Sequence, residues 1–178
     1  MPSLDSNQNQ RIQRGAPAHA QAKVYIAPRR LRRGLGRTDR SGGSGRGGQL
    51  PRVGRRVVAA VVEHNGRFLV CQRPLQKRHG GLWEFPGGKL EDGEDLAQAA
   101  RRELAEELAL EVLEVGGVRY SLSDAGSVFT IEFVDVRVSG VPNPFEHLQV
   151  EWCTPAELLE MPLAPSDRRF AERLAGAP

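Results

Sequence analysis

Glutamates recur at short intervals in the stretch GKLEDGEDLAQAARRELAEELAL, which runs from Gly88 to Leu110. Glu103, Glu106 and Glu107 stand three and four residues apart, a spacing that puts all three on one face of a helix. Three carboxylates so close together would repel one another unless a cation lay between them, and oxygen ligands suit a hard divalent metal. The stretch therefore predicts a metal site on a helix.

A glycine-rich loop precedes these glutamates. Residues 83–89 read WEFPGGK, in which Pro86 fixes one backbone dihedral. Gly87 and Gly88 lack the side chains that would keep a phosphate or a metal away from the backbone. We expect a tight turn with an exposed backbone, so that loop and helix together form a cradle for a metal and a phosphate chain.

The whole pattern resembles the Nudix box, G-x5-E-x7-R-E-U-x-E-E-x-G-U, in which U is a bulky aliphatic residue. Eight of its nine defined positions match, namely Gly88, Glu94, Arg102, Glu103, Leu104, Glu106, Glu107 and Leu110. Ala109 stands in place of the last glycine. An alanine can end a helix at modest cost if its backbone angles stay in ordinary regions, so we expect the metal ligands to be unaffected. A solvated charged helix face is the alternative interpretation, and so many matches disfavour it.

The resemblance implies hydrolysis of a nucleoside diphosphate linked to another group, with Mg²⁺ or Mn²⁺ as the cofactor. In the family, the three clustered glutamates hold the metals, and the carbonyl of the residue matching Gly87 often adds a ligand. Glu94 and Arg102 would then form an ion pair that fixes the loop against the helix.

A further glutamate outside the box has a counterpart in MutT-like members of the family, on a loop before a late tryptophan-bearing strand. Glu146, six residues before Trp152, holds the matching place. The likeness implies that it binds metal or helps to activate water. The alternative is a solvated loop acid beside His147, and we expect His147 itself to be a polar loop residue rather than a ligand.

Residues outside the box also resemble the MutT and cytidine triphosphate pyrophosphohydrolase branch, because QRP at 72–74 is followed by WEFPGGK. By that likeness Arg73 would contact phosphate or sugar, Phe85 would flank the base, and Lys89 would bind substrate. Asp167 would accept a hydrogen bond from an exocyclic amino group of the base. The alternatives are an ion pair at a strand end for Arg73, a core position for Phe85, and a helix N-cap at Ser166 or Asp167.

Local signals predict the elements that position these residues. Asp95 and Gln98 fit a capping box, and an apolar stripe recurs every four residues at Leu96, Ala100, Leu104 and Leu108. Strands are predicted at 57–62, 68–71, 111–120, 128–138 and 149–153, with a hairpin turn at Asn65-Gly66 and helices at 155–160 and 166–174. The fold class expected is α/β, a Nudix-type α/β/α sandwich with a mixed sheet.

Charge divides the chain of 178 residues, whose formal net charge is +3. Residues 1–56 hold 13 Lys and Arg against Asp5 and Asp39, or +11, which leaves −8 for the remainder. We interpret residues 1–55 as a disordered Arg/Gly-rich arm and 56–178 as one Nudix hydrolase domain. The arm is either a passive tail or the product of a start codon assigned too early, and we favour these over RNA, DNA or membrane binding and over a targeting peptide.

Two cysteines, Cys71 and Cys153, stand in apolar surroundings without metal-ligand spacing. A reduced, cytoplasmic protein is therefore expected, and no stretch is long and apolar enough to span a membrane. We expect a monomer or a homodimer.

The leading functional hypothesis is hydrolysis of nucleoside or deoxynucleoside triphosphates, with oxidised or modified ones as candidate substrates, to a monophosphate and pyrophosphate. An ADP-sugar or dinucleoside polyphosphate hydrolase is the first alternative, although the proline that often follows the box in ADP-sugar hydrolases is missing between Glu111 and Gly140. A non-catalytic module that binds nucleotides or nucleic acids, like the domain that ends adenine DNA glycosylases, is the second. Such modules typically lack the acidic box.

Overall fold

The computed structural model describes residues 55–123 and 128–176. The arm predicted for residues 1–55 therefore lies outside the described residues, except for Arg55, which belongs to the first strand.

Two small sheets form the centre of the domain. The elements in chain order are β1 (Arg55–Val61), β2 (Glu63–His64), β3 (Arg67–Gln72), β4 (Trp83–Glu84), β5 (Gly87–Lys89), α1 (Leu96–Leu108), β6 (Glu111–Ser123), β7 (Phe129–Ser139), β8 (Gln149–Cys153), α2 (Pro155–Glu160) and α3 (Pro165–Leu174). One sheet has the order β5-β1-β7-β6, in which β1 and β7 are parallel and the other pairs are antiparallel. The other joins β2, β3, β4 and β8. The predicted mixed sheet is confirmed.

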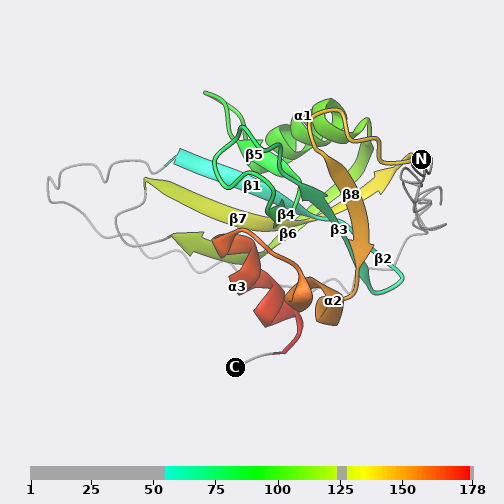
Figure 1. Ribbon diagram of the computed structural model, residues 1–178. Helices are drawn as coiled ribbons and strands as arrows, with labels where there is room; N and C mark the ends of the chain where they lie inside the picture. Colours follow the sequence, from blue (N-terminus) through cyan, green and yellow to red (C-terminus); the bar gives the residue numbers. More distant parts are fainter. Residues whose placement is uncertain (1–54, 124–127, 177–178) are drawn as a thin grey trace, which may run out of the picture.

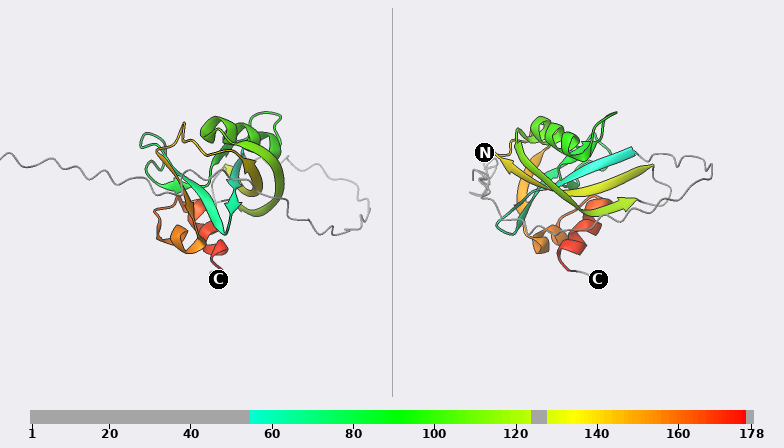
Figure 2. Two further views of the ribbon diagram at one scale, coloured as in Figure 1. Left: turned by 90° about the vertical axis from the view of Figure 1, so that its right-hand side faces the viewer. Right: turned by 180° about the vertical axis from the view of Figure 1, so that it is seen from behind.

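Helices cover the strands from two sides, as the prediction of an α/β/α arrangement required. α1 lies above the strands in Figure 1, and α2 and α3 lie below them. The two turned views in Figure 2 show the same layering. Apolar residues such as Leu104 pack one hydrophobic cluster under α1, and a second, aromatic cluster joins Phe133 to Phe170 of α3 at a ring-centroid distance of 4.2 Å. Among the described residues, no helix is long and apolar enough to cross a membrane.

The glycine-rich loop is more regular than the sequence predicted. Residues Trp83–Glu84 and Gly87–Lys89 form short strands on either side of Phe85 and Pro86, whereas a turn alone was expected. Gly88 pairs with Val58 of β1, so the loop is fixed to the central sheet by backbone hydrogen bonds.

The ends of α1 differ in how well local sequence predicted them. The capping box between Asp95 and Gln98 is present, with both reciprocal hydrogen bonds. At the other end, Ala109 adopts the left-handed conformation, with φ 55° and ψ 31°, so the condition of ordinary backbone angles is not met. This conformation lets the N–H of the buried Leu110 reach the carbonyl of Leu104 at 3.1 Å and turns the chain into β6. It costs an alanine about 1 kcal/mol that a glycine would avoid.

Candidate active site

A cleft of about 670 Å³ opens between the glycine-rich loop, α1, the segment after β3 and the start of α3. The residues predicted from the sequence that line it are Arg73, Phe85, Gly87, Lys89, Arg102, Glu103, Glu107, Glu146 and Asp167. Glu94 and Glu106 lie outside this lining. The fold thus gathers residues from five separate parts of the chain around one cavity.

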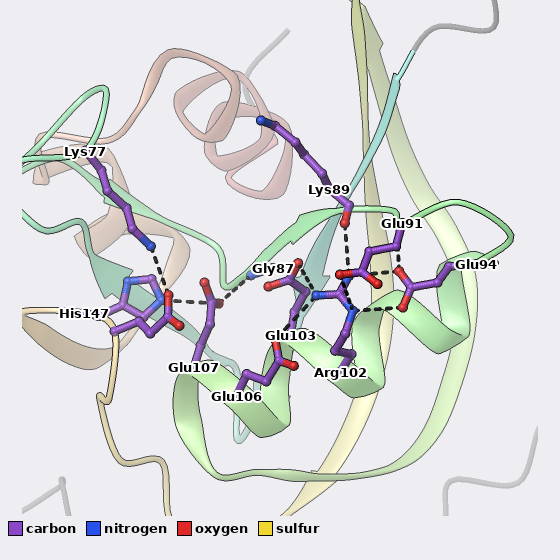
Figure 3. Close-up of polar contacts among 11 residues, drawn as sticks. Lys77, Gly87, Lys89, Glu91, Glu94, Arg102, Glu103, Glu106, Glu107 and His147 are labelled. Atoms are coloured by element: carbon purple, nitrogen blue, oxygen red, sulfur yellow. Dashed lines mark hydrogen bonds and ion pairs between the residues drawn. The ribbon is translucent and has the colours of Figure 1, made fainter.

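Two carboxylates from α1 form the acidic centre of the cleft. The side chains of Glu103 and Glu107 are only 14 % and 8 % exposed. Glu107 Oε2 accepts a hydrogen bond of 3.1 Å from the N–H of Gly87 (Figure 3). Because β5 is held to the sheet, this bond fixes the helix carboxylate against the loop backbone.

Glycines are required where these carboxylates meet β5. Gly87 has φ +142°, which side chains rarely allow, and a Cβ there would lie 2.2 Å from the carbonyl oxygen of Val58. At Gly88 a Cβ would lie 2.1 Å from Oε1 of Glu103. The missing side chains are therefore what lets the Glu103 carboxylate reach the backbone.

Arg102 ties the loop to the helix. Its guanidinium donates two hydrogen bonds of 2.8 Å to the Glu94 carboxylate and one of 3.1 Å to the carbonyl of Lys89. The bond from Arg102 is the main reason why the pKa of Glu94 falls to about 2. Arg102 also donates to Glu103 at 2.9 Å (Figure 3). One side chain therefore binds both Glu94, in the loop before α1, and Glu103, which lines the cleft.

The two remaining carboxylates among the candidate metal ligands, Glu106 and Glu146, each pair with a basic side chain. Glu106 is 57 % exposed, and its carboxylate is 3.5 Å from Arg102. Glu146 lies on the rim of the cleft, about half exposed, where it pairs with Lys77 at 3.0 Å. Among the described residues, no three carboxylate or imidazole groups already converge at metal-ligand spacing. Drawing Glu106 onto a cation shared with Glu103 would require Arg102 to give up a contact.

The residues nevertheless fit a hard divalent cation. Burial raises the pKa of Glu103 despite the lowering effect of the Arg102 hydrogen bond, and the negative charge of Glu107 raises it further. The two carboxylates, beside a backbone without side chains, offer oxygen donors, which is the donor type that Mg²⁺ and Mn²⁺ prefer. A cation between them would relieve the repulsion.

A second acidic group lines the same cleft, and it includes Glu84, which the sequence reasoning missed. Burial raises the pKa of Glu84 to about 7, against the lowering effect of the Arg73 guanidinium that pairs with it. Burial likewise raises the pKa of Asp167 to about 6. The sequence offered one indication of this role for Glu84: it lies within WEFPGGK, eleven residues after Arg73.

Asp167 holds α3 against the loop. Its Oδ1 accepts a hydrogen bond of 2.8 Å from the N–H of Phe85, and its Oδ2 accepts one of 2.9 Å from Ser166 Oγ. The alternative interpretation of Ser166 or Asp167 as a helix N-cap was wrong, because Ala164 occupies that position without a side-chain hydrogen bond. Pro165 occupies the first helical position, where it has no N–H that would need a partner.

Phe85 and Lys89 both line the cleft, but neither side chain points toward the glutamates of α1. The Phe85 ring is 3 % exposed and packs edge-on against Phe133 and Phe170, so most of its surface serves the core. The Lys89 ammonium lies 5.3 Å from the centroid of the Phe129 ring, and its side chain points away from the glutamates (Figure 3).

His147, expected as a polar loop residue, is buried instead. Its side chain is 2 % exposed, and Nε2 lies 3.3 Å from Oε2 of Glu107. No local sequence pattern around His147 predicted this contact, because His147 and Glu107 are far apart in the chain and meet only in the folded domain.

The chain is similar to several known proteins. A family model described as the NUDIX domain matches residues 53–174. The chain is 41 % identical over 114 residues to the CTP pyrophosphohydrolase of Escherichia coli, which covers 62 % of this chain and 84 % of that protein. It is 50 % identical over 60 residues to the 8-oxo-dGTP diphosphatase of Proteus vulgaris, covering 33 % of this chain and 53 % of that one. The solution structure of the E. coli ORF135 protein superposes with a TM-score of 0.60 at 38 % identity, over 72 % of this chain and 94 % of that one.

Proposed function

The chain belongs to the NUDIX family, as its box predicted, and on that premise we propose that it hydrolyses nucleoside triphosphates to a nucleoside monophosphate and pyrophosphate. One water is consumed, one bridging P–O bond is broken, and a proton is released. The observation that carries the proposal is the pair of buried carboxylates, Glu103 and Glu107, held beside a side-chain-free backbone in a cleft of nucleotide size.

In this proposal Mg²⁺ or Mn²⁺ is held by Glu103 and Glu107, with Glu106, Glu146 and the carbonyl of Gly87 as further donors. A divalent cation at this place would neutralise phosphate charge and lower the pKa of a water molecule. Arg102 keeps the loop and helix at a constant separation through its bonds to Glu94 and Lys89. Glu94 and Arg102 thus act on the site through the backbone that they position.

The basic residues of the cleft suit the anionic part of a triphosphate. Arg73 and Lys89 both line the cavity. We propose that Arg73 binds phosphate or sugar and that Lys89 binds substrate. Arg73 is already paired with Glu84, so the orientation of its guanidinium is restricted before substrate arrives.

Another part of the cleft lining suits a base. Phe85 belongs to this lining, and Asp167 and Glu84 contribute carboxyl groups with raised pKa values. Carboxylates accept hydrogen bonds from exocyclic amino groups, as on cytosine or on guanine and its oxidised form. The names of the two relatives, a CTP pyrophosphohydrolase and an 8-oxo-dGTP diphosphatase, support candidates with such groups.

The test is a product analysis on purified full-length protein with Mg²⁺ or Mn²⁺. The panel contains canonical, oxidised and methylated nucleoside triphosphates, ADP-ribose and a dinucleoside polyphosphate. Monophosphate and pyrophosphate from one triphosphate would support the proposal and identify the substrate. Turnover of ADP-ribose or the dinucleotide alone would favour the first alternative, and no turnover of any of them would favour a binding module.

We propose that the basic segment 1–52 takes no part in this reaction, because the family match begins at residue 53. Deleting it should leave kcat and KM within about twofold of the full chain. A collapse of activity in a folded truncated protein would contradict this. Both cysteines are buried and free, as a reducing compartment would keep them, and we propose a cytoplasmic location.

A further inference from the structure

His147 reaches the catalytic helix from a segment that is tied to it. The N–H of Phe145 donates to the carbonyl of Glu107 at 2.9 Å, and the N–H of Leu148 donates to the carbonyl of Gln72 in β3 at 2.9 Å. The residues between these two bonds therefore bridge α1 and the second sheet. His147 stands inside this bridge, so its backbone is tied to both α1 and β3.

The imidazole of His147 has few ways to satisfy its nitrogens. The side chain is 2 % exposed, and neither ring nitrogen makes a hydrogen bond to any part of the chain that the structure describes. A buried polar group without a partner is costly, and such a group in a folded protein calls for an explanation. The nearest explanation is the Glu107 carboxylate, whose Oε2 lies 3.3 Å from Nε2 (Figure 3).

We propose that His147 is a positioning residue for Glu107, and this inference rests on the proposed function, in which Glu107 holds a divalent cation. The oxygen Oε2 of Glu107 has the N–H of Gly87 as its hydrogen-bond donor and the His147 ring as its second neighbour. A carboxylate oxygen that accepts one hydrogen bond and lies against a buried ring has less rotational freedom before the cation binds. Groups that orient a metal ligand in this way typically contribute 10-fold to 100-fold in metal affinity.

A histidine that only filled space would behave differently. Leucine has a similar shape and could replace such a filler without any effect on metal affinity. A positioning histidine instead needs a donor near the place of Nε2. Glutamine can bring its amide nitrogen close to that place, whereas asparagine is too short, so the two amides form a matched pair.

The test measures Mn²⁺ binding to the full-length protein without nucleotide, from the electron paramagnetic resonance signal of free Mn²⁺. We expect His147→Leu and His147→Asn to raise the dissociation constant roughly tenfold, and His147→Gln to stay within about threefold of wild type. The same variants should raise the Mn²⁺ concentration for half-maximal activity in parallel, with KM for the nucleotide nearly unchanged. His64→Leu, outside the cleft lining, is the matched control and should change neither quantity.

Three outcomes would overturn the inference. His147→Leu or His147→Asn could fold, as circular dichroism would show, and bind Mn²⁺ as wild type does. His147→Gln could lose as much affinity as His147→Leu. Finally, His147→Leu could weaken binding equally in a Glu107→Gln background, where a residue that acts through Glu107 should have no further effect. If Glu107→Gln itself left Mn²⁺ binding unchanged, the metal assignment of the proposed function would fail, which separates the two failures.

Discussion

Replacing Gly88 by alanine should separate catalysis from folding. The three atoms nearest to a Cβ at this position all belong to the tip of Glu103, with Oε1 at 2.1 Å and Cδ at 2.4 Å. An ordinary contact begins at 3.4 Å, so the Glu103 carboxylate must retreat by about 1.3 Å. Because this tip is the far end of a flexible side chain, the fold should tolerate the change. A misplacement of about 1 Å at a catalytic group can cost roughly 100-fold in rate.

The neighbouring glycine provides the contrast. In Gly87→Ala the new Cβ would meet the backbone carbonyl of Val58 at 2.2 Å, at a φ of +142°. Neither the carbonyl nor the dihedral can yield cheaply, so we expect a loss of about 3 kcal/mol in the free energy of unfolding. That corresponds to a melting temperature roughly 10 °C lower.

Two assays distinguish these effects. Pyrophosphate release with Mg²⁺ gives kcat and KM, and thermal unfolding followed by circular dichroism gives stability. Gly88→Ala should lower kcat roughly 100-fold with a melting temperature close to that of wild type. Gly117→Ala is the control, because nothing lies within 4 Å of a Cβ there. Full activity with a wild-type Mg²⁺ requirement in Gly88→Ala would refute the role of Glu103, and a collapse in its melting temperature would refute the argument that Glu103 can yield.

Three further predictions concern single residues. Glu106→Gln should lower kcat by about 100-fold without unfolding the domain, because it removes one negative donor at unchanged volume, and retained turnover would remove Glu106 from the proposed metal site. Ala109→Gly should raise the free energy of unfolding by about 1 kcal/mol in a urea titration, because glycine adopts φ 55° without strain, and no gain would mean that the helix end relaxes in solution. The folded-state pKa of Glu84, raised from 4.5 to about 7, means that the folded protein binds the extra proton, so stability should fall as pH rises through this window. Glu84 contributes at most about 3 kcal/mol to that fall. In metal-free urea titrations, the loss of stability with pH should be smaller for Glu84→Gln than for wild type. Part of the loss should remain in this variant, because the pKa of Asp167 is raised from 3.8 to about 6. An equal fall in both proteins would contradict the raised pKa of Glu84.

Local sequence was sufficient wherever the interaction itself is local. The capping box of α1 joins residues three positions apart, and the hairpin turn needs only Asn65 and Gly66, which adopt φ 52° and 73°. The helix and most strands were therefore predicted within a few residues of their ends. The Nudix box also lies within one short stretch, which is why the family and its chemistry could be predicted from residue types and spacing alone.

Local sequence failed where a residue's environment depends on distant parts of the chain. Alanine ordinarily avoids the left-handed conformation, but Ala109 adopts it because the connection between α1 and β6 requires a left-handed residue there. Asp167 was open to interpretation as a cap, but its partner is the N–H of Phe85, 82 residues earlier.

The sequence by itself determined the chemistry of this protein, because residue types and their helical spacing specify an acidic, oxygen-rich site beside a glycine backbone. Only the tertiary structure decided which carboxylates face the cleft. Glu103 and Glu107 are buried, and Glu106 is turned to solvent beside Arg102, although helical spacing treats the three alike. The buried partners Glu84 and His147 also emerged only on folding. The physical reason is that burial and charge pairing are set by side chains from remote segments, and no spacing rule encodes which of them will meet.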